Sequence, residues 1–454
     1  IMGTHFQTHT SDMSASLSCS SVAQSVALSE SMWQKTSTDG LSGNLDSTNT
    51  DVGPDIVGLL TKLFSKGKYE LVVEIAEELV NRHPQSFFLH NILGESLAFM
   101  DQNLKAVRHF EKILQLEPSK TEDSVWQDCK PNVHNNIGVA LKSLGLLEES
   151  KKHFVKSLHL DPKHAPTYNN YGNLLNEMAD LSGAKEKFLK AIELEPSSHI
   201  AYWNLHSTTN EEKIATAIIE ESLKQAPTFK EAVFTLAGMR AFNGNDTYFN
   251  ELLSTEFADE PILTSINWIL SLPKLPQVHF NRWSMFDHAV ELSDTSRPFY
   301  EYGVWMGDSF KYLMQYFKKG YGFDTFLGLP EDWRSVPKGA YSSFGKVPNI
   351  DGGEFIVGEF QNSLPEFFAK PRSVAGLINF DADLYASTLC ALVNSKPIID
   401  EKTVLIFDEF IINRGWEHDE FRALEEFCKA NGLDYEVIAI SLYTKQVMVR
   451  LVGL

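Results

Sequence analysis

The chain has 454 residues, of which 43% are hydrophobic, and its formal net charge is −20. This length and apolar content are enough for two or three domains with cores of their own. The acidic balance argues against a surface built to neutralise phosphates, so nucleic acid is not an expected partner.

The cysteines and the hydropathy pattern limit the cellular setting. The four cysteines lie far apart and form no CxxC pair, which indicates neither a zinc site nor a disulfide framework. No run of about 18 apolar residues predicts a membrane span. No basic segment followed by an apolar stretch opens the chain. We therefore expect a cytoplasmic protein that binds no membrane.

The first 52 residues differ in composition from the rest of the chain. Ser, Thr, Asn and Gly dominate residues 1–52, and aromatic residues are almost absent. Such a segment cannot bury enough apolar surface to offset the entropy lost on ordering. The composition predicts a disordered N-terminal segment, which we interpret as a linker or a tag remnant.

Prolines recur at regular intervals within residues 53–230. They close the helical stretches "NRHP", "QLEP", "HLDP" and "ELEP", with intervals of 34, 44 and 34 residues. Small and aromatic residues recur at fixed offsets from these prolines: Gly94, Gly138 and Gly172, then Phe110, Phe154 and Phe188. This pattern resembles the tetratricopeptide repeat, which implies helical hairpins stacked into a solenoid. The longer interval implies an insertion near residues 119–130.

Three asparagines share one repeat offset. Asn136, Asn170 and Asn204 are 34 residues apart. Stacked repeats would place these amides in a row along the concave face, where each could donate to and accept from an extended peptide. A similar asparagine ladder grips peptides in the repeat domain of the protein O-linked N-acetylglucosamine transferase. The alternative is that Asn merely suits the helix surface at this offset.

The hydrophobic pattern changes in the second half of the chain. Residues 231–279 have helix-spaced apolar positions and are predicted to form a helical connection. Short β-type runs then alternate with helical ones: "FYEYG", "YGFD", "EFIVG", "SVAGLINF", "TVLIFD", "YEVIAI" and "QVMVRLV". This alternation predicts a mostly parallel seven-stranded α/β domain over residues 280–454, with an antiparallel C-terminal hairpin at the sheet edge.

The ends of the first two predicted strands carry ligand-binding signals. Gly303 and Gly307, in "EYGVWMGDS", do not form the GxGxxG of a dinucleotide fold, although glycines let a ligand approach the turn closely. Asp324 ends the second strand, a position from which a carboxylate reaches a ribose diol. Together they predict a nucleoside-containing cofactor without a pyrophosphate.

These motifs resemble the class I S-adenosylmethionine-dependent methyltransferases. Within that class, "EYGVWMGDS", "GFDTFLGLPEDW", "FIVGEFQNSLPEFF", "NFDADLYAST" and "LIFDEF" look in order and spacing like the macrocin O-methyltransferase family of antibiotic-sugar enzymes. The resemblance implies a Rossmann-like fold that binds S-adenosylmethionine. On that likeness, Glu301, Gly303 and Gly307 shape the cofactor turn, Ser309 meets the methionine carboxylate, and Asp324 holds the ribose. The alternative is that Glu301 and Ser309 only cap a strand and a helix.

Acidic residues follow two strands that we expect to be neighbours. Asp381 and Asp383 follow one strand, and Asp408 and Glu409 follow the other. Carboxylates this close repel one another unless a cation neutralises them, and an all-oxygen set suits Mg²⁺. The macrocin-type relatives place magnesium at the positions of Asp381, Asp408 and Glu409, where it would activate a hydroxyl nucleophile. They usually show a second Asp where this chain has Glu409, whose longer side chain puts the metal geometry in question.

Asp381, Asp383 and His418 are the catalytic candidates. Asp383 is a possible general base, with a helix-capping role near Tyr385 as its alternative. His418 is a second possible base, with a surface or capping role as its alternative.

The sequence therefore predicts a homo-oligomeric, Mg²⁺-assisted O-methyltransferase. Its acceptor would be a hydroxyl of a small, sugar-like or natural-product metabolite or of a repeat-bound peptide. The competing hypothesis is a tetratricopeptide scaffold whose methyltransferase-like domain is inactive.

Overall fold

The computed structural model describes residues 52–116, 123–334 and 336–454. The segment predicted to be disordered lies, except for Val52, outside the described residues. The chain divides into two compact units, Ile1–Ala201 and Tyr202–Leu454. Every helix in the described part of the chain is too short or too polar to span a bilayer.

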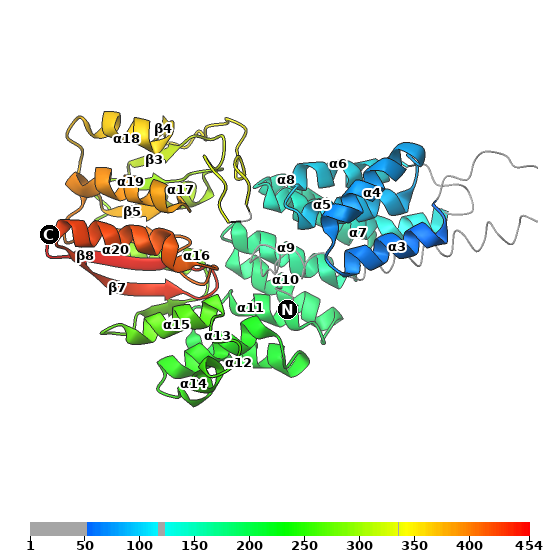
Figure 1. The fold of residues 1–454 in the computed structure, drawn as a ribbon, viewed down its shortest axis with the longest axis horizontal. Helices are drawn as coiled ribbons and strands as arrows, with labels where there is room; N and C mark the ends of the chain where they lie inside the picture. Colours follow the sequence, from blue (N-terminus) through cyan, green and yellow to red (C-terminus); the bar gives the residue numbers. More distant parts are fainter. Residues whose placement is uncertain (1–51, 117–122, 335) are drawn as a thin grey trace, which may run out of the picture. The chain divides into compact units, whose positions relative to one another are not determined.

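The described part of the first unit consists of consecutive helix pairs, and a short turn joins the two helices of each pair (Figure 1). The pairs are α3 (Pro54–Ser65) with α4 (Tyr69–Arg82), α5 (Phe87–Phe99) with α6 (Asn103–Leu114), α7 (Asp123–Ser143) with α8 (Leu147–Leu160), and α9 (Ala165–Glu177) with α10 (Leu181–Leu194). This arrangement agrees with the predicted tetratricopeptide solenoid. The described part of the predicted insertion lies in α7, which has 21 residues.

A glycine lets the two helices of a pair approach closely. A Cβ atom added at Gly138 on α7 would lie 2.6 Å from Cε1 of Phe154 on α8. The same contact recurs in the flanking pairs, at Gly94 with Phe110 and at Gly172 with Phe188. The glycine and phenylalanine offsets seen in the sequence are therefore packing contacts between paired helices.

We expect Gly138→Ala to destabilise the protein by about 1–3 kcal/mol, because the added methyl group overpacks a fully buried Phe154. Urea unfolding followed by circular dichroism measures this loss. In a double-mutant cycle with Phe154→Leu, the two changes should couple, since the smaller side chain makes room. Gly58→Ala is the control, because nothing lies within 4 Å of its added Cβ. Additive losses in the cycle would contradict the packing argument.

The second unit contains one eight-stranded mixed sheet in the order β1-β7-β8-β6-β5-β2-β3-β4. Its strands are β1 (Gln277–His279), β2 (Phe299–Tyr302), β3 (Gly320–Asp324), β4 (Gly353–Val357), β5 (Leu377–Phe380), β6 (Val404–Phe407), β7 (Asp434–Ser441) and β8 (Val447–Val452). Neighbouring strands are parallel except where β8 pairs with β6 and β7.

The sheet differs from the prediction in two ways. All seven predicted strands are present, but β1 adds an eighth at the edge, where it pairs with β7. The C-terminal hairpin of β7 and β8 forms as predicted, yet it does not lie at the edge, because β1 pairs with the outer side of β7. A three-residue strand such as β1 is too short to show a hydrophobic period.

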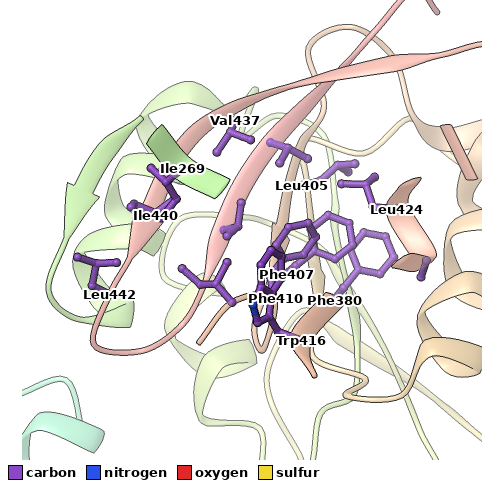
Figure 2. Packing of buried hydrophobic residues seen from close by; sticks show 14 of the residues in the cluster. Ile269, Phe380, Leu405, Phe407, Phe410, Trp416, Leu424, Val437, Ile440 and Leu442 are labelled. Carbon is purple, nitrogen blue, oxygen red and sulfur yellow. The ribbon is translucent and has the colours of Figure 1, made fainter. Parts of the chain in front are cut away.

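Helices that precede the sheet in sequence share its core. One core cluster combines residues of α12 (Glu212–Gln225), α13 (Lys230–Phe242) and α15 (Pro261–Ser271) with residues of the sheet. Figure 2 shows Ile269 of α15 in this cluster with Phe380 and Phe407, whose rings stack with centroids 4.7 Å apart. The segment predicted as a connection is therefore part of the compact unit that holds the sheet.

The remaining helices of the unit pack against strands or against other helices. α18, α19 and α20 pack side by side, and α16 contacts β1, β6 and β7 (Figure 1). These helices are α14 (Thr247–Leu253), α16 (Arg282–Leu292), α17 (Asp308–Leu313), α18 (Phe360–Phe368), α19 (Tyr385–Ser395) and α20 (Glu420–Asn431), with α11 (His199–His206) at the unit boundary.

Candidate functional site

The strand order of the sheet reverses between β2 and β5. From β2 the chain order continues outward through β3 and β4, whereas β6 follows β5 on the other side. In open α/β sheets, ligands bind outside the carboxyl ends of the strands at such a reversal. Most of the predicted site residues lie in or directly after β2, β3, β5 and β6, and therefore near this point.

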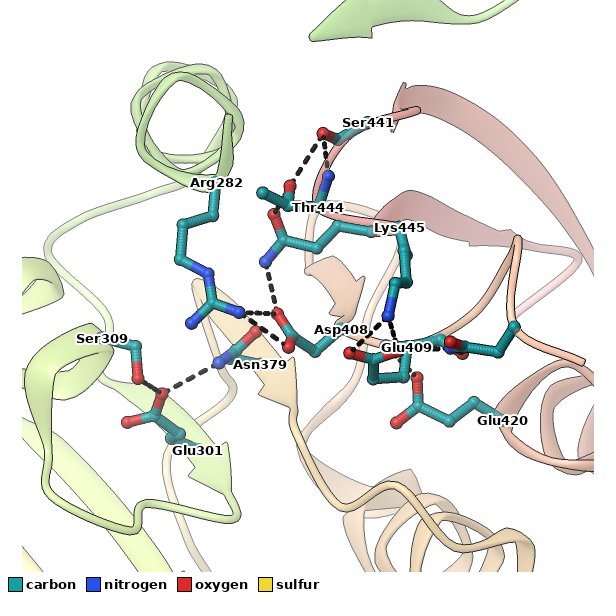
Figure 3. A network of polar contacts seen from close by, with 12 residues as sticks. Arg282, Glu301, Ser309, Asn379, Asp408, Glu409, Glu420, Ser441, Thr444 and Lys445 are labelled. Atoms are coloured by element: carbon teal, nitrogen blue, oxygen red, sulfur yellow. Dashed lines mark hydrogen bonds and ion pairs between the residues drawn. The ribbon is translucent and has the colours of Figure 1, made fainter. Parts of the chain in front are cut away.

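Two buried polar residues meet at the reversal. Glu301 of β2 and Asn379 of β5 are register partners, and both are fully buried. Oε1 of Glu301 accepts hydrogen bonds from Oγ of Ser309 at 2.6 Å and from Nδ2 of Asn379 at 2.8 Å (Figure 3). Oε2 of Glu301 and Oδ1 of Asn379 have no hydrogen-bond partner among the described residues. Because a buried acceptor without a donor costs free energy, these oxygens suit a ligand that donates.

The charge state of Glu301 points to the kind of donor. Burial raises its pKa to about 8, against the opposing effect of the hydrogen bonds from Ser309 and Asn379. A positive charge beside Oε2 would stabilise the carboxylate. When Glu301 is ionised, its unpaired oxygen therefore suits an ammonium group better than a neutral donor.

Ser309 contacts the carboxyl of Glu301, and its contact with a methionine carboxylate stays a prediction. Its hydroxyl donates to Glu301, so the predicted contact with a methionine carboxylate would require that bond to break. The capping alternative is wrong, because Gly307 is the N-cap of α17 and no side chain caps that helix. As found, Ser309 positions the carboxyl of Glu301.

The turn after β2 requires glycine. Gly303 has a φ of +88°, and a Cβ atom there would lie 1.7 Å from the carbonyl oxygen of Asp381. Gly307, with a φ of +83°, precedes α17. The turn between β2 and α17 therefore passes close to the backbone that follows β5.

Asp324, at the end of β3, holds this turn in place. Its Oδ2 accepts hydrogen bonds from the N–H groups of Val304 and Trp305, both at 2.8 Å. Its Oδ1 accepts one from the N–H of Phe326 at 2.7 Å. A carboxylate oxygen can accept two hydrogen bonds, so Oδ1 keeps one position for a ligand hydroxyl.

Asp381 and Asp383 follow β5, and both are partly exposed. Desolvation raises the pKa of Asp381 well above its usual range, and the neighbouring Asp408 adds to this. Desolvation, followed by the charge of Glu409, raises the pKa of Asp383 to about 8. The capping alternative for Asp383 is wrong, because Leu384 is the N-cap of α19 and no side chain caps that helix.

Two cations face the acids that follow β6 (Figure 3). Nη2 of Arg282 lies 2.9 Å from Oδ2 and 3.3 Å from Oδ1 of Asp408, and Nε2 of Gln446 donates to Oδ1 at 2.6 Å. Nζ of Lys445 lies 3.1 Å from Oε2 of Glu409. The charges of Asp408 and Glu409 are therefore balanced by protein side chains.

This arrangement does not fit the predicted magnesium site. Within residues 52–116, 123–334 and 336–454, no group of three or more His, Cys, Asp or Glu side chains could hold a metal ion. Arg282 and Lys445 lie where a cation was expected to neutralise the acids. We therefore assign no magnesium to Asp381, Asp408 and Glu409.

The environment of His418 differs from that of the acids that follow β5 and β6. His418 is exposed, in the 3₁₀ turn η2 (Trp416–His418). The capping alternative is wrong, because Asp419 is the N-cap of α20 and no side chain caps that helix. A role for His418 as a base stays a prediction.

Sequence reasoning missed Arg282, Asn379, Glu420 and Lys445. Glu420 is fully buried, its Oε2 accepts the N–H of Glu409 at 3.1 Å, and burial raises its pKa well above the usual range. Asn379 could have been noticed as the polar residue of the apolar strand "LINF". Arg282 and Lys445 carry no such signal, because both lie outside the motifs and far from the acids in sequence.

The three repeat asparagines are buried, and their amides contact other side chains of the chain. Nδ2 of Asn136 donates to Glu95 at 3.4 Å, and Nδ2 of Asn170 donates to Asn135 at 3.0 Å. Asn204 belongs to the second unit, where its Oδ1 accepts from the hydroxyl of Tyr443 at 3.3 Å. Binding of a peptide by these amides stays a prediction.

A family model matches part of the repeat region. The tetratricopeptide repeat family matches residues 131–164 and 165–198, so these two stretches are tetratricopeptide repeats. No curated protein matches the chain.

Solved structures resemble parts of the chain. One is CalS11, a calicheamicin methyltransferase, which is 19% identical to this chain. The match covers 45% of this chain and 90% of CalS11, with a TM-score of 0.30. The O-methyltransferase NovP is 20% identical and covers 37% of this chain and 78% of its own, with a TM-score of 0.29. YrrB, a tetratricopeptide protein with an unusual peptide-binding site, is 12% identical and covers 43% of this chain and 99% of its own, with a TM-score of 0.30. Likenesses this distant carry no argument about function.

Proposed function

We propose that the second unit is a Rossmann-like domain that binds S-adenosylmethionine and transfers its methyl group to an oxygen atom. The observation that carries this proposal is the pair of unpaired, buried acceptor oxygens on Glu301 and Asn379 at the strand reversal. An α-ammonium group offers both a positive charge and several donors to that pair. Asp324, one strand away, offers an acceptor to a ribose hydroxyl. S-adenosylmethionine carries both groups in one molecule.

When bound, the cofactor supplies an electrophilic methyl group. Glu301 and Asn379 would orient its amino-acid end, and Gly303 would let it lie close to the turn backbone. The oxygen of the acceptor hydroxyl would replace the sulfur on the methyl carbon, so that S-adenosylhomocysteine would leave with the electron pair of the broken bond, and the hydroxyl proton would pass to a carboxylate. Asp383, with Asp381 as the neighbouring candidate, suits this role because its raised pKa makes the ionised form a stronger base than an ordinary Asp. The acceptor would be a small sugar-like or natural-product metabolite, or a peptide held by the repeats.

Calorimetric titration with S-adenosylhomocysteine tests the proposal directly. We expect it to bind at least about 100-fold more tightly than adenosine or homocysteine alone, because the site recognises both halves. A folded protein that binds none of the three would overturn the proposal.

We expect chelation of divalent cations to leave this binding unchanged, because Arg282 and Lys445 already balance the acids. The Kd for S-adenosylhomocysteine should agree within about twofold before dialysis against EDTA, after it, and after Mg²⁺ is added back. A large loss of affinity after EDTA treatment that is reversed by Mg²⁺ would contradict the conclusion that Arg282 and Lys445 balance the acids.

The tetratricopeptide match over residues 131–198 favours a second candidate function, a partner-binding scaffold with an inactive sheet domain. Asp381→Ala separates the two, since a scaffold should keep its biological function in a folded variant whereas an enzyme should lose it. A homo-oligomer also stays a prediction, and a clean monomer in gel filtration would contradict it.

A further inference from the structure

Two histidine pairs occupy equivalent positions in consecutive repeats. Nδ1 of His90 on α5 lies 3.0 Å from Nδ1 of His109 on α6. Nδ1 of His134 on α7 lies 3.1 Å from Nδ1 of His153 on α8. The partners of each pair are 19 residues apart, and the second pair follows the first by 44 residues, the interval between these two repeats.

The repeat architecture does not require these histidines. The next helix pair, α9 and α10, has Tyr168 and Lys187 at the corresponding positions, 34 residues further along. That pair lies within the residues that match the tetratricopeptide family. A helical hairpin of this kind therefore forms without a histidine pair.

One partner of the first pair has a defined tautomer. Nε2 of His90 lies 3.1 Å from the carbonyl oxygen of Pro84, which can only accept, so Nε2 carries the hydrogen. In the neutral ring, Nδ1 of His90 then carries a lone pair directed at His109. His109 is partly exposed, so its own proton can move to Nε2 by exchange with water. Two Nδ1 lone pairs would then face the same point.

The spacing suits two ligands of one transition-metal ion. With metal–nitrogen bonds of about 2.1 Å, two nitrogens at a right angle lie about 3.0 Å apart, and two at a tetrahedral angle about 3.4 Å. The observed 3.0 and 3.1 Å match the right angle, which is found in the tetragonal geometry of Cu²⁺ and Ni²⁺. Since the described residues contain no group of three or more suitable ligands, water would complete the coordination.

We propose that the His90–His109 and His134–His153 pairs are two separate chelating sites for Cu²⁺ or Ni²⁺.

The surroundings of the two pairs differ in charge. Lys112 lies near His90, whereas Lys130 and Lys156 both lie near His134. Because a lysine repels a metal cation, the His90–His109 pair should bind the ion more tightly.

Titration of the full chain with Ni²⁺ at pH 7 tests the proposal. His109→Asn and His153→Asn should each remove one binding event, and His109→Asn should remove the tighter one. His159→Asn is the matched control, since this exposed histidine on α8 belongs to neither pair. Other histidines can also bind Ni²⁺, among them His5, His9 and the pair His279 and His288, so each site is measured as a difference from the wild type.

Equal Ni²⁺ binding by the wild type and by a folded His109→Asn/His153→Asn variant would overturn the proposal. Thermal stability is a second readout, because Ni²⁺ at about 100 times its Kd should raise the Tm of the wild type more than that of the double variant. If these variants do not fold, Cu²⁺ is added instead to a chain that carries His5→Asn, His9→Asn and His288→Asn, so that these other histidines do not contribute to the spectrum. An electron paramagnetic resonance spectrum with coupling to two nitrogens supports chelation, and one without it overturns the proposal.

Discussion

Glu301→Gln is expected to weaken binding of S-adenosylhomocysteine by at least about 30-fold, equivalent to about 2 kcal/mol. The substitution keeps the shape of the side chain and removes the charge that would pair with the ligand's ammonium group. The loss should appear in calorimetric titration at pH 8, where Glu301, with a pKa of about 8, is ionised in a large fraction of molecules.

The same substitution should stabilise the protein in a pH-dependent way. The pKa of Glu301 is higher in the folded state, at about 8, than the value of about 4.3 expected in the unfolded chain. The folded state therefore holds its proton more tightly, and the wild type loses stability as the pH rises from about 4.3 to about 8. Glutamine has no proton to lose, so Glu301→Gln should be more stable than the wild type by about 4–5 kcal/mol at pH 8 and should have nearly the same stability as the wild type near pH 4.

Urea unfolding across this pH range measures the second effect. Glu366→Gln, an exposed change on α18, is the control and should alter neither stability nor binding. Unchanged affinity for S-adenosylhomocysteine in Glu301→Gln would contradict the proposed role of the carboxyl. If the difference in stability between Glu301→Gln and the wild type did not vary with pH, the raised pKa of the buried Glu301 would be contradicted.

Arg282→Met is expected to destabilise the protein by about 3–5 kcal/mol, because it leaves the carboxylate of Asp408 buried without its cation. The side chain of Asp408 is only 6% exposed, so water cannot replace the guanidinium. The loss should shrink at low pH, where protonation removes the uncompensated charge. Urea unfolding at pH 5 and pH 8 measures both effects.

A rescue variant and a control ion pair test whether the loss comes from the unpaired charge of Asp408. Adding Asp408→Asn should restore most of the lost stability, since it removes the unpaired charge. Arg297→Met breaks the more exposed pair with Asp400 and should cost less than about 1 kcal/mol. Equal costs for the two arginines, or no rescue by Asp408→Asn, would show that Arg282 does not balance a buried charge.

Both predictions concern the acids of the second unit whose pKa values are raised by burial. Glu301, Asp381, Asp383, Asp408 and Glu420 all have pKa values raised first of all by burial. A fold selected only for stability gains nothing from this arrangement, because each ionised acid costs desolvation energy. Groups with strongly perturbed pKa values are typical of binding and catalytic sites, and here they gather at the edge of the sheet where a ligand is expected.

Sequence patterns were sufficient to predict most helices and strands and the turns that end them. The repeat interval appears as prolines, and Gly138 and Phe154 appear at their offsets, because both signals depend on neighbours within one hairpin. The seven longer strands are visible because apolar runs alternate with helical ones. Asp381, Asp383, Asp408 and Glu409 could be assigned to one sheet edge, since parallel strands end on the same side.

The ion pairs at the sheet edge form through long-range contacts that sequence patterns do not report. Arg282 comes before the sheet's central strands and Lys445 from the turn between β7 and β8, yet they balance Asp408 and Glu409 in place of the expected metal ion. The edge strand β1 and the position of β8 inside the sheet were likewise beyond sequence patterns. Hydrophobic periodicity reports which face of an element is buried, whereas ion pairs and strand order depend on contacts between residues far apart in the chain.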